Sequence, residues 1–402
     1  MTIKQTKYPT SLIPSTKNNT LGKNMYNIKN GNSFIKEKKI AYQKKKIKTL
    51  FKNLKLNYNI KNIKSEGLPG LSVKIFKKFF LSSKWPYLTP QKYSFIKESY
   101  YGGNIVHLKT RGKRLFYYDI NSLYPYSLIN KFPIKKPRMK KYPKLNESFG
   151  FIKAVISAPN FMQYNFLPRK KGLNTLTDEK TWIGTYFSEE LKFAKSIGYN
   201  ITPIEGLIYN YKENILADFI LYLYGLKGNH PIPAKILLNS FYGKLSSGNS
   251  SALKFSFSPT VITPKNQKPS NEKKLASIII ASTTTSYARI FMFKKMCPHD
   301  NPVYYSDTDS LVTQHKIENN KKHQRKIGLF KNTIHTKKEN QSFLDSMLLK
   351  KPRAYSYSTL KKIIILKGAN YPRKKVLKPN NFHYSIIING KLINSIHIVE
   401  LI

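Results

Sequence analysis

The stretch YYSDTDSLV, from Tyr304 to Val312, sets two aspartates one residue apart between two apolar segments. The arms VYYS and LVT hold the β-branched and aromatic residues that strands favour. About two residues separate the arms, which is the spacing of a tight β-hairpin. An isolated D-x-D is most often a plain polar turn, but strand-like arms on both sides predict a hairpin with Asp307 and Asp309 at its tip.

A third aspartate extends this pattern. Asp119 is the first of only seven aspartates in the chain, and it comes near the end of the strand-like segment RLFYYDI. The ends of β segments are places where side chains from separate strands converge. Hard divalent cations prefer oxygen ligands, and two Mg²⁺ ions held by two or three carboxylates form a usual clamp for phosphoryl transfer. The three aspartates therefore predict a Mg²⁺ site.

The chain around these aspartates is strongly basic. Its 402 residues carry 71 Lys and Arg against 20 Asp and Glu, a formal net charge of +51. Nucleic acid is the natural counter-charge, although an AT-rich coding genome would also raise the lysine content. Only eight of the basic residues are arginines. Because lysine attracts phosphate with little directionality, the composition favours backbone binding over sequence-specific reading.

Composition also excludes several classes of protein. Cys297 is the single cysteine, which excludes disulfides within the chain and thiolate metal sites. Since no apolar run approaches the ~20 residues of a membrane helix, we expect no membrane association. The N-terminal stretch lacks the apolar core of a signal peptide and the arginines of a mitochondrial transit peptide. If the protein works in an organelle, we expect it to be made there.

Periodicity and turn residues predict the remaining elements. Apolar spacing predicts helix from Gly67 onward, and Gly102-Gly103 predict a sharp backbone turn. Short strands are expected between 113 and 210, interrupted by a helix at 188–198 with Ser188 as its N-cap and Gly198 past its end. Two further helices are expected at 232–246 and 274–296, with loop and hairpin between them.

The helix at 232–246 carries polar residues at a suggestive spacing. Lys235, Asn239 and Tyr242 stand at i, i+4 and i+7, so they share one face, while leucines and Phe241 cover another. A cation, an amide and a phenol on one side can hold a triphosphate and a base. A plain solvent-facing surface remains the alternative for such a pattern.

Together these stretches resemble the motifs of family B DNA polymerases, in the same order along the chain. YYDINSLYPYSLI is similar to the DxxSLYP motif, KILLNSFYG to KxxxNSxYG, and YYSDTDS to YxDTDS. SYYGG resembles the YxGG element of the protein-primed branch, and KPRAY resembles the late KxY element. Over about residues 64 to 370 the chain looks most like the DNA polymerases of linear mitochondrial plasmids.

The resemblance implies a role for each matching residue. Asp119 and Asp309 would be ligands of two Mg²⁺ ions, with Asp307 a supporting carboxylate. Tyr124 would be a steric gate that excludes the ribose 2′-hydroxyl, and Pro125 after it predicts extended backbone angles there. The remaining implied contacts are Lys235, Asn239 and Tyr242 with the incoming nucleotide, and Tyr100, Gly102, Gly103, Arg353 and Tyr355 with DNA.

The resemblance also implies a fold and a domain order. We expect an α+β right-hand polymerase with an antiparallel β-sheet palm, helical fingers and a small or incomplete thumb. The expected segments are a basic N-terminal arm at 1–64, a remnant of the exonuclease-to-palm region at 65–112, palm with an insertion at 113–231, fingers helices with a hairpin insertion at 232–296, palm with the YxDTDS hairpin at 297–350, and a short thumb at 351–402.

Two departures from the family are visible. Proofreading members carry an N-terminal exonuclease built on aspartates, whereas no aspartate precedes Asp119 here, so we expect no proofreading activity. Arg353 stands where the family usually has lysine, which keeps the charge but changes its geometry.

The resulting hypothesis is a DNA-directed DNA polymerase that binds template, primer and dNTPs, encoded by and acting in a mitochondrion or its plasmid. A catalytically inactive DNA-binding relic is the alternative, and a reverse transcriptase or RNA polymerase is a more distant one. Both a protein hydroxyl, from a terminal protein, and a DNA end stay open as the primer.

Overall fold

A computed structural model describes part of the chain. The described residues are 72–73, 75–80, 86, 88–162, 164–169, 175–176, 180–228, 230–246, 277–296, 301–317, 326–334, 343–351, 354–358, 365–367, 385–388 and 391–394. The chain divides into two compact units, Met1–Phe79 with Tyr222–Phe241, and Phe80–Leu221 with Tyr242–Ile402. The expected arm at 1–64 and the loop and hairpin before residue 277 lie outside the described residues.

Helices dominate the described part of the first unit. It contains most of the short π-helix η2 (Phe76–Phe80), the end of α6 (Ala217–Gly225) and most of α7 (Pro231–Ser246). Prolines are tolerated in the first turn of a helix, so α7 begins at Pro231 without strain. Phe241 of α7 packs edge-to-face on Phe76 at 5.3 Å between ring centroids. The helix predicted at 232–246 is confirmed.

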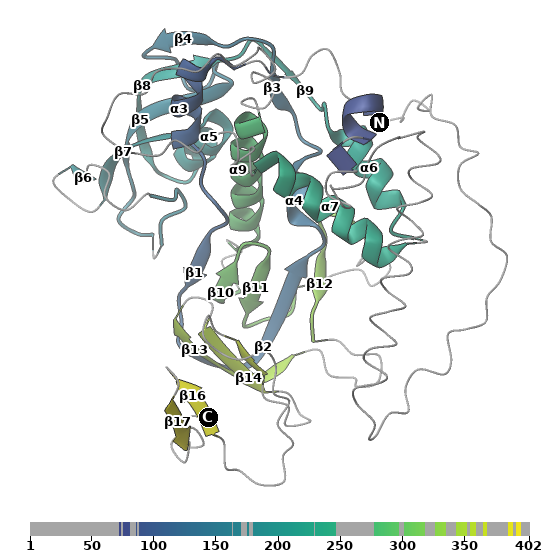
Figure 1. Cartoon of the computed structure of the whole chain (residues 1–402). Helices are drawn as coiled ribbons and strands as arrows, with labels where there is room; N and C mark the ends of the chain where they lie inside the picture. The colour runs from purple at the N-terminus through teal and green to yellow at the C-terminus, as the bar shows by residue number, and fades with distance from the viewer. Residues whose placement is uncertain are drawn as a thin grey trace. The chain divides into compact units, whose positions relative to one another are not determined.

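The second unit contains an eight-stranded sheet in which all pairs are antiparallel, drawn in the lower half of Figure 1. The strand order is β1-β10-β11-β2-β13-β14-β15, and β12 also pairs with β2. The strands are β1 (Ile105–His107), β2 (Arg111–Ile120), β10 (Val303–Asp307), β11 (Ser310–Thr313), β12 (Phe330–Asn332), β13 (Leu344–Lys351), β14 (Ala354–Ser358) and β15 (Ile365–Lys367). The central strand β2 therefore organises the sheet.

A second sheet of five strands follows the order β4-β8-β5-β7-β6. Its strands are β4 (Arg138–Lys141), β5 (Gly150–Ser157), β6 (Thr175–Leu176), β7 (Thr181–Phe187) and β8 (Asn200–Ile208). The strands predicted at GFIKAVIS and GYNITPIEGLIY are thereby confirmed. Smaller ladders join β3 (Phe132–Ile134) to β9 (Tyr211–Glu213) and β16 (Ser385–Ile388) to β17 (Lys391–Asn394).

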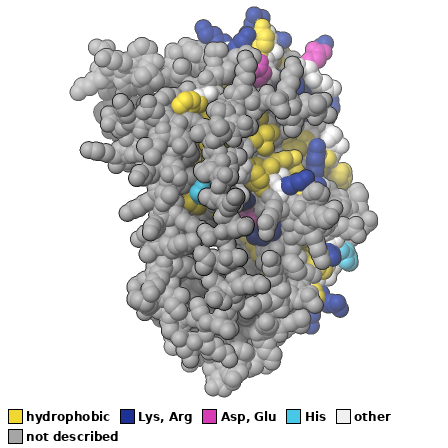
Figure 2. All heavy atoms as spheres, turned by 90° about the vertical axis from the view of Figure 1, so that its right-hand side faces the viewer, with side chains coloured by type: hydrophobic (Ala, Val, Ile, Leu, Met, Phe, Trp, Pro, Cys, Tyr) yellow, Lys and Arg dark blue, Asp and Glu magenta, His cyan; other side chains and the backbone are white. Residues whose placement is uncertain are grey.

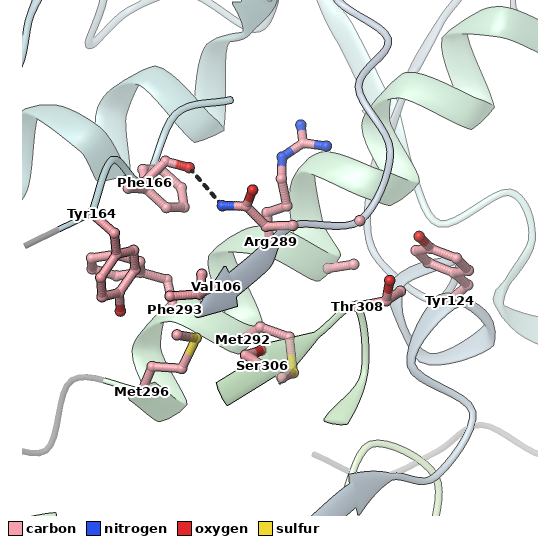
Figure 3. A pocket seen from close by; sticks show the side chains of 13 residues that line it. Val106, Tyr124, Tyr164, Phe166, Arg289, Met292, Phe293, Met296, Ser306 and Thr308 are labelled. Atoms are coloured by element: carbon pink, nitrogen blue, oxygen red, sulfur yellow. Dashed lines mark hydrogen bonds between the residues drawn. The ribbon is translucent and has the colours of Figure 1, made fainter. Parts of the chain in front are cut away.

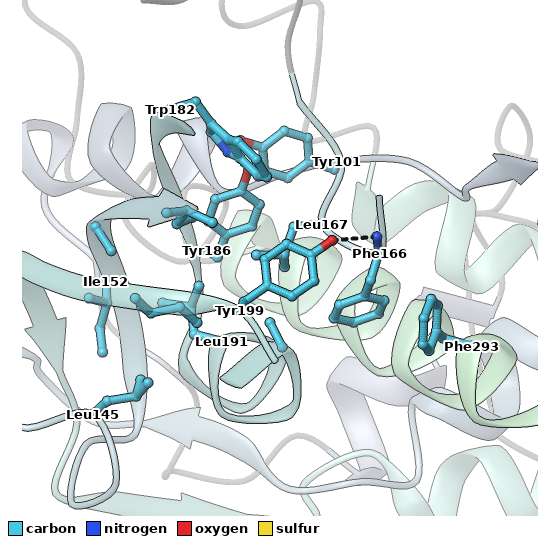
Figure 4. Packing of buried hydrophobic residues seen from close by; sticks show 14 of the residues in the cluster. Tyr101, Leu145, Ile152, Phe166, Leu167, Trp182, Tyr186, Leu191, Tyr199 and Phe293 are labelled. Carbon is cyan, nitrogen blue, oxygen red and sulfur yellow. Dashed lines mark hydrogen bonds between the residues drawn. The ribbon is translucent and has the colours of Figure 1, made fainter. Parts of the chain in front are cut away.

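The long helix α9 (Ser277–Met296) packs against residues of both sheets. Met292 belongs to a buried cluster with Tyr118 and Leu311 of the eight-stranded sheet. Phe293 belongs to another cluster with Tyr186 of the five-stranded sheet (Figure 4). A helix enclosed in this way is apolar or buried around most of its circumference. Among the described residues, this unit also contains the whole of α3 (Pro90–Glu98), α4 (Leu123–Ser127) and α5 (Ser188–Ser196).

The start of α5 differs from the prediction. Ser188 is the first helical residue, and Phe187 is the N-cap and makes no side-chain cap hydrogen bond. The Ser188 hydroxyl accepts a hydrogen bond from the backbone N–H of Gly150 at 3.1 Å instead. A tertiary contact with β5 has therefore replaced the local cap. Gly198 lies past the helix end with φ +99°, as predicted.

The mixture of antiparallel sheets and helices confirms the α+β class. Within the described ranges, no helix is long and apolar enough to cross a membrane.

The tyrosine-rich core offers a matched pair of substitutions. Among the described residues, the buried Tyr209 hydroxyl has no hydrogen-bond partner, whereas the Tyr186 hydroxyl donates to Pro168 O at 2.7 Å and accepts from Trp182 Nε1 at 2.9 Å. We expect Tyr209→Phe to raise the free energy of unfolding or leave it unchanged, and Tyr186→Phe to lower it by about 1–3 kcal/mol. Urea unfolding at pH 7 measures both.

Alkaline pH gives a second readout. Burial raises the pKa of Tyr209 above its ordinary value of 10.0. Ionisation of this tyrosine in the unfolded chain therefore lowers the free energy of unfolding of the wild type as the pH rises above 10. The stability advantage of Tyr209→Phe over the wild type should therefore widen above pH 10. A constant difference across that range would contradict this prediction.

Candidate active site

The strand register brings the predicted carboxylates to one end of the eight-stranded sheet. Asp119 of β2 pairs with Ser310 of β11, and Ser310 pairs with Asp307 of β10. Residues paired across antiparallel strands point to the same face, so Asp119 and Asp307 share a face two strands apart, a backbone separation of ~10 Å. Asp309 occupies the turn between β10 and β11.

The turn that carries Asp309 is fixed on both sides. Asp309 N–H donates to Asp307 O at 2.7 Å, and Thr308 takes a left-handed φ of 60°. The backbone N–H of Ile120 donates to Asp309 O at 2.7 Å, which ties the turn to the strand that carries Asp119. The predicted hairpin is confirmed, and all three aspartates are half-buried.

This donor set suits a hard cation. Mg²⁺ usually takes one or two carboxylates and completes its octahedron with water and substrate phosphates. Among the described residues, no group of three or more His, Cys, Asp or Glu side chains converges to hold an ion. Asp119 and Asp309 would supply the one or two carboxylates of such a site, and water and substrate phosphates would supply its other ligands.

Tyr124 lies beside this site and differs from the prediction in its backbone. It belongs to the short helix α4, so the extended conformation expected before Pro125 is wrong. Its ring packs on Tyr242 at 4.5 Å between centroids. The pKa of the Tyr124 hydroxyl is raised to about 12, chiefly by burial, while Arg289 lowers it and Asp309 and Asp307 are among the groups that raise it. The phenol therefore stays neutral at physiological pH and lies within the field of the carboxylates.

Tyr242 and Tyr100 extend this aromatic group. Tyr242 is only 8% exposed, and burial, the neighbouring Tyr100 and Tyr124, and a side-chain hydrogen bond with Tyr100 raise its pKa. The structure thus brings together Tyr100, Tyr124 and Tyr242, which the sequence had assigned to three separate motifs.

The segment after Tyr100 contacts the carboxylate turn directly. Gly102 and Gly103 lie in irregular backbone without a positive φ, so the sharp turn predicted there is not formed. A Cβ on Gly103 would lie 2.5 Å from Thr308 Oγ1, whereas one on Gly102 would meet nothing within 4 Å. The N–H of Thr308 donates to Asn104 O at 2.9 Å. Gly103 is required here for close approach and not for turning.

For the remaining predicted residues, the structure does not establish the position of the side chain relative to the carboxylates. Lys235 and Asn239 are exposed on α7 and belong to the first unit, so their relation to the carboxylates stays a prediction. Tyr355 lies in β14, paired with Leu349. Arg353 lies outside the described residues.

Sequence reasoning missed other polar residues near the site. Lys331 of β12 pairs with Asp119, so an exposed lysine stands beside the strand positions of Asp119, Ser310 and Asp307. Glu190 of α5 and Arg289 of α9 form a buried ion pair beside the Tyr100–Gly103 segment. The scarcity of arginine in so basic a chain was a signal for Arg289, but nothing in the local sequence identified its partner.

A small cavity lies behind the turn (Figure 3). Its volume is about 20 Å³, room for about one water molecule. Tyr124 and Thr308 line one side, and Met292, Met296 and Tyr164 line the other. It is too small for a base or a sugar.

Comparison with known proteins identifies the family. The family model for type B DNA polymerases of organelles and viruses matches residues 2–285. The chain belongs to this family. The resemblance to family B DNA polymerases drawn from the motifs is thereby confirmed.

Relatives of this type B chain include fungal and phage proteins. A probable DNA polymerase of Podospora anserina is 29% identical over 322 residues, covering 65% of this chain and 27% of that protein. The DNA polymerase of Streptococcus phage Cp-1 is 29% identical over 279 residues, covering 60% of this chain and 48% of the phage protein. The chain thus matches about a quarter to a half of the length of these relatives.

Solved structures show the same fold. Phi29 DNA polymerase in a ternary complex with primer-template DNA and incoming nucleotides has a TM-score of 0.60 at 16% identity, covering 83% of this chain and 67% of that one. Its binary complex with primer-template DNA has a TM-score of 0.56.

The close approach at Gly103 gives a prediction. Gly103→Ala should displace Thr308, break its 3.0 Å hydrogen bond to Asp307 Oδ1, and lower the free energy of unfolding by about 1–3 kcal/mol. Gly102→Ala is the matched control, and we expect its free energy of unfolding within about 0.5 kcal/mol of the wild type. Equal effects of the two substitutions in thermal unfolding would show that Thr308 does not require this glycine.

Proposed function

We propose that the chain is a DNA-directed DNA polymerase that extends a primer 3′ end with deoxynucleotides by two-metal phosphoryl transfer. The observation that carries this proposal is the row formed by Asp119, Ser310 and Asp307, with the Asp309 turn tied to β2. Asp119 and Asp309 would hold two Mg²⁺ ions, and Asp307 would support the turn. The bound ions would favour deprotonation of the primer hydroxyl and offset charge on the transferring phosphoryl group.

The surrounding residues take the roles that the family motifs imply. Tyr124 would lie under the sugar, supported by its packing on Tyr242. Lys235 would contact the incoming phosphates, and Asn239 would help to line the nucleotide site. The proposed DNA contacts are Tyr100, Gly102, Gly103, Arg353 and Tyr355.

Charge supports binding to a nucleic-acid backbone. The net charge is +51, and Lys and Arg side chains stand along the upper edge of the face shown in Figure 2. Every residue of β4, which carries Arg138, Lys140 and Lys141, is exposed. Solved Phi29 DNA polymerase, which shares this fold, is bound to primer-template DNA. The partners proposed for this chain are template, primer and dNTPs.

The right-hand architecture is part of the proposal. The eight-stranded sheet would be the palm, α7 and α9 would belong to the fingers segment 232–296, and residues 351–402 would contribute the thumb. Since β14 and β15 belong to the eight-stranded sheet, the proposed thumb segment would begin with strands of the proposed palm sheet. The organellar and viral family and the fungal relatives support action on mitochondrial or plasmid DNA. Both DNA and a terminal protein remain candidate primers.

The carboxylates separate an enzyme from a DNA-binding relic. We expect Asp119→Asn and Asp309→Asn each to lower the rate of nucleotide incorporation by about 10³-fold or more, because each removes a metal ligand. DNA affinity should stay near the wild-type value, since lysines elsewhere supply it. Primer extension with Mg²⁺ and a DNA-binding titration measure the two effects. Extension at the wild-type rate by either variant would falsify the assignment, and an inactive wild type that binds DNA would favour the relic.

Sugar selection tests Tyr124. Tyr124→Ala should raise the ratio of rNTP to dNTP incorporation, because the truncated side chain leaves room for a 2′-hydroxyl. Tyr126→Ala is the control. Tyr126 lies in α4 like Tyr124, but its ring packs on Phe291 of α9 at 5.1 Å between centroids, and it has no proposed contact with the sugar. Single-nucleotide extension with both substrates, beside a melting curve, gives the ratio. If folded, active Tyr124→Ala kept the wild-type ratio, Tyr124 would not be the gate.

A further inference from the structure

The guanidinium of Arg289 is enclosed and completely hydrogen-bonded. Arg289 is 3% exposed and Glu190 is 0% exposed. Nε and Nη2 donate to the two carboxylate oxygens of Glu190 at 2.6 and 2.7 Å, and Nη2 also donates to Ser286 Oγ at 3.0 Å. Nη1 donates to Tyr101 O at 2.9 Å and to Gly102 O at 2.8 Å. All five N–H donors of the arginine are therefore used.

The polar partners come from distant parts of the sequence. Glu190 lies 99 residues before Arg289, and Tyr101 lies 188 residues before it. The Tyr101 ring stacks on Tyr186 at 5.1 Å with an interplanar angle of 9°. Arg289 thus joins α5 and α9 to the segment that leads into β1.

Stability alone does not account for such a pair. Removing two charges from water costs free energy that their attraction offsets only when the geometry is good, and apolar replacements are often no less stable. Desolvation by burial lowers the pKa of Arg289, but the charge and hydrogen bonds of Glu190, together with Tyr124 and Tyr186, raise it above its ordinary value, so the group stays charged. An arginine whose planar guanidinium uses all five donors also fixes the position of the backbone that it binds.

A second anchor on α9 supports the same segment. Ser282 Oγ donates to Ser99 O at 2.8 Å. Ser282, Ser286 and Arg289 are spaced i, i+4 and i+7, so they form one face of the helix. This face binds the backbone carbonyls of residues 99, 101 and 102 in succession.

The held segment leads directly to the carboxylates. Gly103 faces the Thr308 side chain, and Asn104 O accepts the Thr308 N–H at 2.9 Å. The next residue, Ile105, pairs with Asp307 in the sheet. Only two residues, Gly103 and Asn104, therefore separate the Gly102 carbonyl that Arg289 binds from Ile105, the β1 residue paired with Asp307.

We propose that Arg289, held by Glu190, is a positioning residue that fixes the 101–104 backbone against Thr308 and so sets the geometry of the Asp307–Asp309 turn. The expected effect on catalysis rests on the proposed function. The effect of Arg289 on the position of the 101–104 backbone can be tested without any activity. Arg289 acts through the backbone and touches neither substrate nor metal.

Two substitutions test the proposal. Glu190→Gln keeps the shape and removes the charge, and Arg289→Lys keeps the charge but loses the fork and cannot reach all its present acceptors. Glu189→Gln is the matched control, because Glu189 is the neighbouring carboxylate on α5 and pairs only with the partly exposed Lys192 at 2.7 Å among the ion pairs of the described residues.

Amide hydrogen exchange by mass spectrometry is the primary measurement. In both variants, peptides covering 101–107 and 303–312 should exchange faster than in the wild type, while peptides of β5 and β8 should not change. Glu189→Gln should match the wild type throughout. Equal protection of the 303–312 peptide in wild type and Glu190→Gln would overturn the proposal, and this isosteric variant decides the matter even if Arg289→Lys fails to fold.

Kinetics give the second measurement. Displacement of a catalytic group by about 1 Å costs about 10²-fold in rate, so kcat should fall by about that factor and the Mg²⁺ concentration for half-maximal rate should rise. A purely structural role would lower the melting temperature and leave kcat and the Mg²⁺ dependence of the folded protein unchanged, which would overturn the proposal. If the wild type does not extend primers, the proposed function fails, and the exchange measurement still tests the positioning.

Discussion

The antiparallel register between β2 and β11 is the constraint on which the candidate site depends. It pairs Asp119 with Ser310, and the adjoining register pairs Ser310 with Asp307. Because strand side chains alternate between faces, a slip of one residue would move Asp119 to the opposite face, toward α9. Register is strongly specified where one face is buried, and the α9 side of β2 buries Tyr118 and Ile120. The same packing that stabilises the sheet therefore sets the carboxylate row.

The helix α9 connects this sheet to the rest of its unit. Its apolar residues join the buried clusters of both sheets, while a face with Ser282, Ser286 and Arg289 binds backbone and a carboxylate. Five successive hydroxyl residues, Ser282–Ser286, are all fully or almost fully buried. Buried hydroxyls need partners, and Thr284 and Thr285 find them in carbonyls one turn earlier in the same helix. The face with Ser282, Ser286 and Arg289 therefore binds the Ser99 carbonyl and the Glu190 carboxylate while remaining buried.

Electrostatics divides the molecule into two kinds of surface. The chain as a whole carries a net charge of +51, whereas the tip of the β10–β11 hairpin concentrates negative charge on half-buried aspartates. A basic surface attracts a nucleic-acid backbone over the Debye length of ~10 Å, and a local acidic group attracts divalent cations to one point within it. This combination of charges supports the proposed polymerase function, and it agrees with membership of the type B DNA polymerase family.

The sequence by itself determined the elements whose signals are local. The hairpin at 304–312, the strand ending near Asp119 and the helices α5, α7 and α9 were predictable, because period, proline, glycine and turn spacing are written in neighbouring residues. The three motifs in order also determined the family. Local rules failed at Ser188, whose hydroxyl binds Gly150 instead of capping its helix, and at Tyr124, which is helical although a proline follows it. Only the tertiary structure decided that Gly103 must admit Thr308 and that Glu190 meets Arg289 across 99 residues, since such contacts depend on how separate elements pack and leave no trace in the spacing of either segment.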